Sequence, residues 1–553
     1  MKRDVQALQA KTFDVLIVGG GVYGAALARE AATRGLATAL LEQADFGSGT
    51  SSSSLKIIHG GIRYLQQADV PRTLISIRER SILLRTAPQL VTPMACLMPT
   101  YGWFMKSRPV MIAGLLANDI LSFNRNVGLP PSRRIPMGTT LSRKQILEVL
   151  PMLASTQTTG AAKWYDAFIY DSERLPLLML KAAANAGAVP VNYVRADSFL
   201  LEGNRVTGVK ATDVLSGQSL DVRAELVINA ASAWSGQLLE RLDRAAATPT
   251  IHYALAVNLI LRGWPISSHS LGLHSTDNNR LYFFAPWRGL TIAGTLYRQY
   301  EGSPDDLKVE EADIEALLKS INSCLPGVIL TREDVVGVHA GILPCRKPAD
   351  PNHEPALLRH SRVIDHARHG GVEGLLSVYT IKYTTARGIA ENLIRRAAKK
   401  LAKPLAREST RTTPLPGGDA PDMAEFVQHV AEAHPEIPAE TRERLSALYG
   451  TELREIFALA DTLPDPRSAE TLLRAELLFA IRNEMPQSLG DLLFRRTAMA
   501  STGGIHPSLV HICADIMGEE CGWNEARRKA EAHAVLNAPL IWRAASARPA
   551  ASS

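Results

Sequence analysis

The hydrophobic and polar positions at the start of the chain alternate in blocks that predict a strand, a helix and a second strand. Phe13–Val18 is a short apolar run, Ala25–Arg34 is a run of good helix formers, and Leu36–Leu41 is a second apolar run. Gly35 is placed to end the helix. This order predicts a βαβ unit, in which a helix connects two parallel strands.

Three glycines between the first strand and the helix have the spacing of a dinucleotide-binding turn. Gly19 permits a tight turn, Gly21 lets the backbone approach a pyrophosphate, and Gly24 lets helix and strand pack closely. Glu42 follows Gly24 by 18 residues and ends the second strand, where a carboxylate can accept from ribose hydroxyls. The segment therefore predicts a dinucleotide site, although by itself it does not distinguish NAD from FAD.

The next segment favours FAD. A serine-rich stretch is often a flexible linker, but this one follows Glu42 closely and runs into an apolar stretch interrupted by Gly60-Gly61. Such a loop can lie along the pyrophosphate, with Thr50, Ser51 and Ser52 at the cofactor. It would also bring three side chains towards the flavin ring, namely His59, Arg63 and Tyr64.

Later blocks predict further domains. Leu226–Ala230 predicts a buried strand that returns to the cofactor sheet, and residues 250–300 predict antiparallel strands, with Leu281–Ala285 and Leu290–Leu296 on either side of a Pro-Trp turn. Residues 403–421 hold four prolines and predict a linker. From Met423 to Ala538 the pattern is helical, which predicts a separate all-helical domain.

Residues 85–125 are apolar but interrupted by prolines and by Asp119, so they do not predict a spanning helix. Two interpretations compete: a buried helix in a capping region, or a surface that dips into a bilayer. We favour the buried helix for most of the segment. Trp103, Phe104 and Lys106 are the candidate interfacial residues.

Composition limits the function without defining it. The 61 Lys and Arg against 55 Asp and Glu give a net charge of +6, which favours weak attraction to anionic lipid or substrate and not nucleic-acid binding. The five cysteines form no CxxC pair, so we expect no metal site and a reducing compartment. The polar N-terminus has no apolar signal-peptide core. These features predict a cytoplasmic protein, peripheral at most on the inner face of the cell membrane.

Taken together, these segments resemble the FAD-dependent glycerol-3-phosphate dehydrogenases of the aerobic, respiratory type. The resemblance runs from about Phe13 to about Trp542. Its most specific stretches are Gly49–Ser52, Lys56–Leu65, Tyr165–Leu175, Ala475–Met485 and Leu489–Thr497.

The resemblance implies an α/β fold of three parts: a glutathione-reductase-type FAD-binding domain, a β-sheet substrate-capping domain and an all-helical C-terminal domain. On this basis we assign residues 1–95, 155–245 and 335–402 to a discontinuous FAD-binding domain. The remaining ranges are 96–154 and 246–334 for the capping region, 403–421 for the linker and 422–553 for the helical domain.

The resemblance also implies a reaction and its residues. Hydride would pass from C2 of glycerol 3-phosphate, a phosphorylated polyol, to flavin N5, and electrons would pass on to a membrane quinone or to oxygen. Arg63, Tyr64, His59 and Lys382 would be catalytic, and Arg359 would bind substrate. Further cofactor contacts are expected from Val194, Ala231 and Thr384. The resemblance leaves open whether the protein forms a homodimer.

Several positions depart from the family pattern. In Thr380–Thr385 the lysine and both threonines match, but Ile381 stands where the family has glycine. The family's phosphate-binding arginine falls on Leu343, so Arg346 just beyond it is a candidate substitute, and the family's substrate-domain histidine falls at Asn258. A relative that oxidises another hydroxyl or amine therefore stays open, as does a non-catalytic flavin-binding protein.

Overall fold

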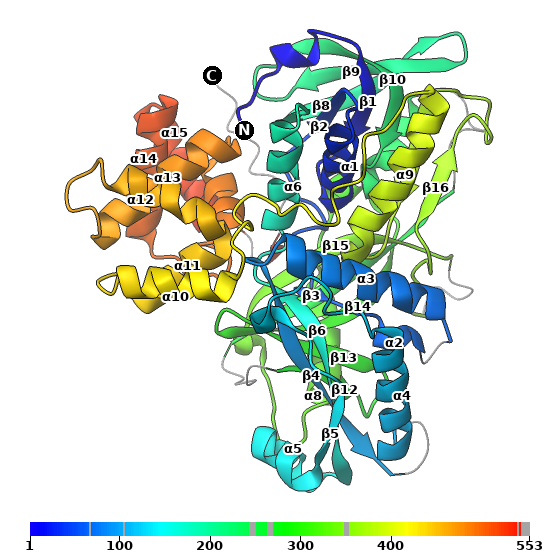
Figure 1. Cartoon of the computed structure of the whole chain (residues 1–553), viewed down its shortest axis with the longest axis vertical. Coiled ribbons are helices and arrows are strands. Elements are labelled where there is room, and N and C mark those ends of the chain that lie inside the picture. The colour runs from blue at the N-terminus through cyan, green and yellow to red at the C-terminus, as the bar shows by residue number, and fades with distance from the viewer. Residues whose placement is uncertain are drawn as a thin grey trace.

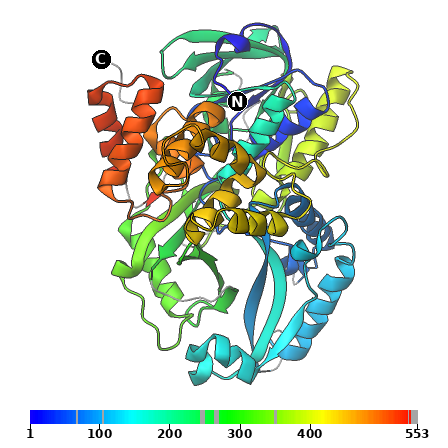
Figure 2. The ribbon, with the colours of Figure 1, turned by 60° about the vertical axis from the view of Figure 1, so that its left-hand side comes forward.

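This computed structural model describes residues 1–65, 68–102, 106–242, 250–262, 269–347 and 353–538, and the backbone of 541–542. The elements form three parts (Figure 1). A sheet flanked by helices occupies the upper half of the view, a second sheet lies below it, and a group of helices lies to one side. Figure 2 shows this group of helices from its own side. The predicted fold class is confirmed.

The first sheet has a parallel centre, with strands in the order β16-β17-β10-β1-β2-β7. Strand β1 pairs in parallel with both β2 and β10. The bounds are β1 Phe13–Val18, β2 Thr38–Glu42, β7 Val189–Asn192, β10 Ser219–Asn229, β16 Arg362–Asp365 and β17 Leu375–Tyr379. Helix α1, Val22–Thr33, joins β1 to β2 as predicted, and the returning strand predicted at Leu226–Ala230 is the end of β10.

Both faces of this sheet are covered, which explains why β1 is apolar at successive positions. Val15 and Ile17 face a core formed with α1, α6 (Arg174–Asn185) and α9 (Ala386–Leu401). Leu16 on the opposite face joins a second core. That core includes side chains of β8, β9 and α7, whose bounds are Val194–Glu202, Arg205–Asp213 and Ser235–Glu240.

The second sheet has the order β18-β15-β11-β14-β13-β12-β4-β6-β3, with β5 paired to β6. Its strands are β3 Ile57–Ile58, β4 Val91–Tyr101, β5 Thr139–Ser142, β6 Thr158–Ile169, β11 His252–Leu261, β12 Ser270–His274, β13 Leu281–Trp287, β14 Leu290–Tyr300, β15 Val335–Cys345 and β18 Ile541–Trp542. The predicted antiparallel pair is β13 with β14. Pro286 and Trp287 belong to β13 itself, and the turn falls at Arg288-Gly289.

Helices pack beside this sheet, and their bounds are α2 Ile62–Leu65, α3 Val70–Thr86, α4 Arg108–Leu121, α5 Arg143–Val149 and α8 Glu311–Asn322. The pairing also bears on the proposed domain boundaries. Strands β6 and β15 lie in ranges that the sequence assigned to the FAD-binding domain, but their hydrogen bonds join them to the second sheet. The boundaries therefore remain a proposal.

The prediction that α4 is a buried helix is wrong. Among the side chains of the helix, only Leu115, Asn118 and Asp119 are buried. Ile120 is 72% exposed and Phe123, just beyond the helix, is 83% exposed. The helix lies beside β4, β5 and β6 of the second sheet (Figure 2), and Val110, Ile112 and Leu116 are also exposed. Of the three candidate interfacial residues, Trp103 and Phe104 lie outside the described residues.

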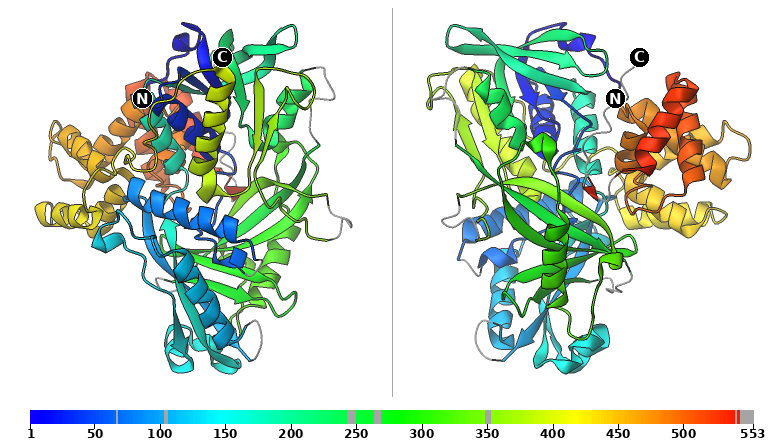
Figure 3. Two further views of the ribbon diagram at one scale, coloured as in Figure 1. Left: turned by 45° about the vertical axis from the view of Figure 1, so that its right-hand side comes forward. Right: turned by 180° about the vertical axis from the view of Figure 1, so that it is seen from behind.

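The C-terminal part is helical, as predicted. Its elements are α10 Met423–Ala433, α11 Ala439–Tyr449, α12 Leu453–Ala460, α13 Ala469–Glu484, a π-helix at Asp491–Arg496, α14 Pro507–Cys521 and α15 Glu525–Leu536. After α15 the chain returns to the second sheet, where the short red strand β18 pairs in parallel with β15 (Figure 3). This pairing ties the end of the chain to the sheet.

Buried ion pairs join the helical part to the first sheet. Asp45, which follows β2, accepts from Arg496 at 2.6 and 2.7 Å and from Arg495 at 2.5 Å. Arg174 of α6 forms a two-point pair with Glu484 of α13 at 2.8 and 3.0 Å. Burial alone would raise the pKa of Asp45, but the charges of Arg496 and Arg495 outweigh it and hold that pKa well below its usual range.

Replacing Arg496 should therefore destabilise the protein strongly. Arg496→Met leaves the carboxylate of Asp45 buried with one cation fewer, and breaking a buried pair in this way costs about 3–5 kcal/mol. Urea unfolding followed by tryptophan fluorescence measures the loss. Arg474→Met is the control, because its pair with Glu519 is exposed and should contribute less than about 1 kcal/mol. Equal losses in the two variants would contradict this account.

Candidate functional site

The turn between β1 and α1 has the shape of a phosphate cradle. Gly19 has a φ of +107°, which favours glycine, and a Cβ there would lie 2.8 Å from the carbonyl oxygen of Ala230. A Cβ on Gly24 would lie 1.8 Å from the carbonyl oxygen of Gly19, so helix and strand are in direct contact. Gly21 is the N-cap of α1 and has no side chain to cap the helix. Free amide groups and positive partial charge at this terminus suit a pyrophosphate.

The serine loop lies against this helix end. Ser51 Oγ accepts from the amide of Val22 at 3.0 Å, in the first turn of α1. Thr50 Oγ1 lies within hydrogen-bond distance of both the amide and the carbonyl of Ile342 in β15, at 3.1 and 3.2 Å. Ser52 is held by its own loop, since its hydroxyl donates to Gly49. The loop therefore bridges the two sheets at the place where a pyrophosphate would sit.

Glu42 lies at the end of β2, as predicted. Its carboxylate accepts from the amides of Gly20 at 2.6 Å and Ala44 at 2.9 Å. Burial raises the pKa of Glu42, and these two hydrogen bonds oppose that shift. Because each carboxylate oxygen can accept more than one hydrogen bond, Glu42 retains capacity for ribose hydroxyls.

The other expected cofactor residues lie at the same end of the first sheet or near it. Ala231 follows β10, and its Cα would lie 3.0 Å from a Cβ on Gly19. Val194 begins β8 and is fully buried beside Leu41 and Val18 in one core. Thr384 is buried in the short helix that precedes α9.

His59 faces a buried carboxylate that the sequence did not single out. His59 Nδ1 lies 3.2 Å from Asp166 Oδ2, and Asp166 Oδ1 accepts from the amide of Gly60 at 2.6 Å and from Arg80 at 3.0 Å. Burial alone would raise the pKa of Asp166, but the hydrogen bond and charge of His59 and the charge of Arg80 lower it below its usual range. Asp166 therefore stays ionised and orients the imidazole, with Nε2 directed away from it.

Lys382 lies close to the same group of charges. Its ammonium donates to Ser76 Oγ at 2.6 Å and lies 4.6 Å from the centre of the Tyr64 ring. Burial lowers the pKa of Lys382 to about 7; the charge of Asp166 opposes this shift, and the charges of Arg72 and Arg80 add to it. Lys382 is therefore a cation that changes its charge near neutral pH.

Arg63 and Tyr64 both lie on α2, directly after the Gly60-Gly61 pair. Tyr64 is covered by Arg72, whose guanidinium lies 3.8 Å from the ring centre. Arg63 is exposed, and within the described ranges its side chain has no hydrogen bond or ion pair. A guanidinium of this kind can serve an anionic ligand, and this role of Arg63 stays a prediction.

The predicted substrate residues of the second sheet separate into two groups. Asn258 is buried in β11, where its Oδ1 accepts from Thr295 at 2.7 Å. Arg346 and Arg359 are exposed. Their backbones are close, because Cys345 bridges to Leu357 in antiparallel register. The structure thus does not bring Arg346 and Arg359 into contact with His59 or Lys382, and their roles remain predictions.

Arg280, just before β13, is a cation that the sequence did not indicate. Its guanidinium lies 5.3 Å from the ring centres of both Tyr282 and Tyr297, and Nη2 donates to the carbonyl of Thr295 at 2.6 Å. The same nitrogen pairs with Glu354 at 2.5 Å. Thr295 also donates to Asn258, so hydrogen bonds link Arg280, Thr295 and Asn258 along one part of the second sheet, which we call the wall that contains Asn258. No local motif marks it, because the contacts come from three separate segments.

The parts described so far define a class of protein. A parallel sheet whose first turn cradles a pyrophosphate, a loop that joins the cradle to a second sheet, and a buried lysine and a carboxylate-bound histidine beside that loop define a flavoprotein oxidoreductase with two sheet domains.

Comparison with known proteins gives the family. Residues 14–396 match the family described as FAD dependent oxidoreductase, and residues 408–528 match the C-terminal domain of alpha-glycerophosphate oxidase. A glycerol-3-phosphate dehydrogenase from Synechocystis is 31% identical over 540 residues, which are 95% of each chain. The mitochondrial glycerol-3-phosphate dehydrogenase of Bos taurus is 31% identical over 96% of this chain and 74% of its own.

A solved structure agrees with these matches. The glycerol-3-phosphate dehydrogenase of Bacillus halodurans, complexed with FAD, superimposes with a TM-score of 0.76 and 25% identity over 96% of this chain and 95% of its own. The chain belongs to the FAD-dependent glycerol-3-phosphate dehydrogenase family. FAD is its cofactor, and the glycine cradle, Glu42 and the serine loop are the residues present that fit it.

Two glycine substitutions should separate cofactor binding from folding. In Gly21→Ala the new Cβ would lie 3.2 Å from Ser51 Oγ, a contact the serine can relieve, so the protein should fold. Its methyl group points into the cradle, and we expect FAD affinity to fall at least about tenfold, or about 1.4 kcal/mol. In Gly24→Ala the clash with Gly19 is with backbone, so the folded protein itself should be lost. Flavin fluorescence titration and circular dichroism measure the two effects; full FAD affinity in Gly21→Ala would contradict the assignment.

Proposed function

We propose that the protein oxidises sn-glycerol 3-phosphate to dihydroxyacetone phosphate. The observation that carries the proposal is the meeting of the His59–Asp166 pair with Lys382, Ser76 and Tyr64 between the serine loop and α3. This arrangement supplies a base and a cation at one place, as removal of hydride from an alcohol with an anionic group requires. Bound FAD supplies the hydride acceptor.

His59 is the group we assign to take the hydroxyl proton. Asp166 holds Nδ1, so Nε2 is the nitrogen directed to the substrate. A base oriented by a buried carboxylate is a recurring arrangement in enzymes that activate a hydroxyl. Asp166 acts through His59 and is therefore a positioning residue.

Cations for the phosphate come from several elements. Lys382 is held on Ser76, Arg63 is exposed on α2, and Arg280 belongs to the wall that contains Asn258. Arginine suits a phosphate because its planar group can donate two parallel hydrogen bonds. Glu354 partly neutralises Arg280, so Arg280 can bind a second anion only through the guanidinium N–H groups that Glu354 does not use.

Anaerobic titration of the FAD-loaded protein tests the reaction. Glycerol 3-phosphate should bleach the flavin absorbance, and glycerol, which lacks the phosphate, should do so only at far higher concentration. Bleaching by another alcohol or by an amine, with none by glycerol 3-phosphate, would favour the alternative substrate. A flavin that no candidate bleaches would favour a non-catalytic protein.

Lys382 predicts a specific pH dependence. With a pKa of about 7, its ammonium form is present below that pH and is lost as pH rises, while the substrate phosphate stays a dianion above its second pKa of about 6. Because the dianion binds the charged form, KM for glycerol 3-phosphate should rise by about tenfold between about pH 6.5 and about pH 9, equivalent to about 1.4 kcal/mol of a charged hydrogen bond. Steady-state kinetics at fixed ionic strength measures this rise.

Two variants sharpen that measurement. Lys382→Met should raise KM at low pH and remove its rise across this range. His59→Asn keeps a nitrogen donor for Asp166 but no base, so it should lower kcat and leave the pH dependence of KM in place. If kcat instead rose through about pH 7 and this rise disappeared in Lys382→Met, Lys382 would be the base and our assignment of roles would be reversed.

We further propose that α4 attaches the protein to the inner face of the cell membrane, where a quinone would take the electrons. None of the described helices combines the length and the apolar character needed to cross a bilayer. The outer face of α4 and the segment after it is apolar instead, through Val110, Ile112, Leu116, Ile120, Phe123 and Val127, which are all more than a third exposed. Arg108 and Arg134 are exposed nearby, as expected for a helix at an anionic surface.

Charge introduced on this face should abolish attachment. Ile120→Asp with Phe123→Asp removes two exposed apolar side chains, and we expect loss of flotation with vesicles that contain anionic lipid. Ile329→Asp is the control, because Ile329 is 82% exposed on a loop far along the chain. FAD content should stay unchanged in all variants. A parent protein that forms dimers broken by these changes, and that binds no vesicles, would instead assign the face to a second copy.

A further inference from the structure

Two side-chain contacts fasten α3 to the start of α9. Lys382 donates to Ser76 at 2.6 Å, and Arg387 donates through Nη2 and Nε to the two carboxylate oxygens of Glu79 at 2.6 and 2.8 Å. Ser76 and Glu79 are one turn apart on α3, so the two contacts lie side by side. The first faces the site and the second lies in the interior.

The second contact leaves little freedom. Arg387 and Glu79 are only 3% and 2% exposed, and a two-point pair fixes orientation as well as distance. The next residue, Gly388, lies so close that a Cβ there would be 2.7 Å from Glu79 Oε1. The first turn of α9 and the middle of α3 are therefore locked together at one separation.

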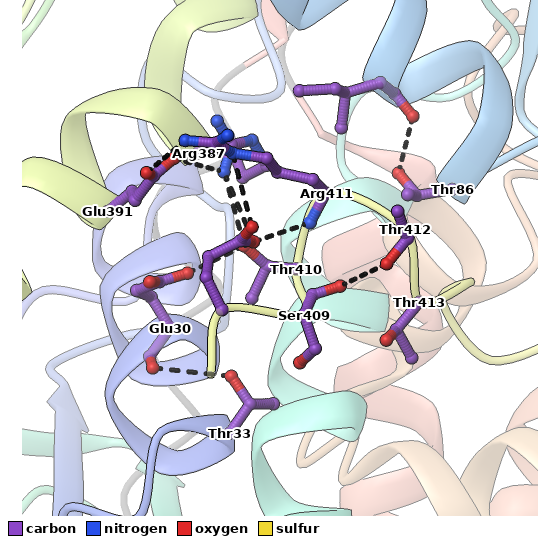
Figure 4. Close-up of polar contacts among 12 residues, drawn as sticks. Glu30, Thr33, Thr86, Arg387, Glu391, Ser409, Thr410, Arg411, Thr412 and Thr413 are labelled. Carbon is purple, nitrogen blue, oxygen red and sulfur yellow. Dashed lines mark hydrogen bonds and ion pairs between the residues drawn. The ribbon is translucent and has the colours of Figure 1, made fainter. Parts of the chain in front are cut away.

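The connector between the sheets and the helical part secures Arg387 from its other side. Thr410 is buried, donates to Glu30 of α1 at 2.7 Å and accepts from Arg387 at 3.3 Å. Glu391 accepts from Arg387 at 3.0 Å and also pairs with Arg411 of the connector. Figure 4 shows Thr410 between Glu30 and the α9 residues. The connector, residues 403–421, is thus anchored to α1 and α9 through Thr410 and Arg411.

We propose that Arg387 is a positioning residue for Lys382: its pair with Glu79 sets the separation of α3 from the start of α9, and so holds the ammonium of Lys382 on Ser76 beside Tyr64. Arg387 is buried against Glu79, Glu391 and Thr410, and it acts through Lys382. The connector, by bracing Arg387, makes the position of this catalytic cation depend on how the helical part is attached. The catalytic role that this inference gives to Lys382 rests on the proposed function. The experiment that tests the inference does not, because it follows the protonation of Lys382 and not turnover.

The charges around Lys382 predict how its pKa should change if α3 and α9 separate. Arg72 and Arg80 face it from α3 and Asp166 faces it from β6, while the Tyr64 ring covers it from α2. Burial is the largest reason that its pKa is low. If α3 moves away from α9, water reaches the ammonium, and its pKa rises towards the ordinary value for lysine.

Competitive labelling of amines measures this directly. The FAD-loaded full-length protein is treated with acetic anhydride over a range of pH, and acetylation of Lys382 is followed by peptide mass spectrometry. In Glu79→Gln and in Arg387→Met the midpoint pH of labelling should rise by about one unit or more. Glu79→Gln keeps the size of the side chain, so it serves where Arg387→Met fails to fold.

Arg395→Met is the matched control. Arg395 lies on the same helix and donates to the same Glu391 at 2.8 Å, but it is 57% exposed and does not touch α3. In this variant the labelling midpoint of Lys382 should equal that in the parent protein. An unchanged midpoint in folded, FAD-loaded Glu79→Gln, or an equal shift in Arg395→Met, would overturn the proposal. Because labelling needs no substrate, absence of flavin bleaching by glycerol 3-phosphate would refute the proposed function alone.

Discussion

Burying a charged side chain costs much free energy unless it is paired with an opposite charge. This constraint determines how the three parts of the molecule are joined. Asp45, three residues after β2, is paired by two arginines of the π-helix. Asp166, in the second sheet, is paired by Arg80 and His59. These carboxylates belong to elements that meet around the cofactor turn, so the pairs that satisfy them also fix the surroundings of the site.

The same constraint separates structural charges from functional ones. Arg496 donates to both carboxylate oxygens of Asp45, and both side chains are buried, so this pair is structural. Lys382 is different: burial lowers its pKa, and its partner Ser76 is a neutral hydroxyl. The two-point ion pair belongs to Arg387, whose partner Glu79 lies one turn from Ser76 on α3. A strongly paired residue next to a poorly paired one gives both rigidity and a group that titrates near neutral pH.

The sequence was informative wherever the determining contacts are local. The β1–α1–β2 unit follows from apolar periodicity and glycine spacing, both of which act within about thirty residues. The contact of Lys382 with Ser76 spans 306 residues and that of His59 with Asp166 spans 107, and no local pattern specifies either. The exposure of α4 was missed for a related reason, since an apolar helix looks the same in sequence whether its outer face meets protein or solvent.

At Leu343, where the family pattern predicts a phosphate-binding arginine, the backbone pairing shows what a side-chain change leaves intact. Leu343 lies in β15, and residues 357–358 lie beside that strand. Leu357 forms a β-bridge with Cys345, and the amide of Leu358 donates to the carbonyl of Pro344. The pairing there is an isolated bridge, so it fixes the backbone of residues 357–358 against β15 without placing the exposed side chain of Arg359. Backbone pairing at this edge of β15 is therefore independent of the side chain at position 343, and the role of Arg359 at the substrate stays a prediction.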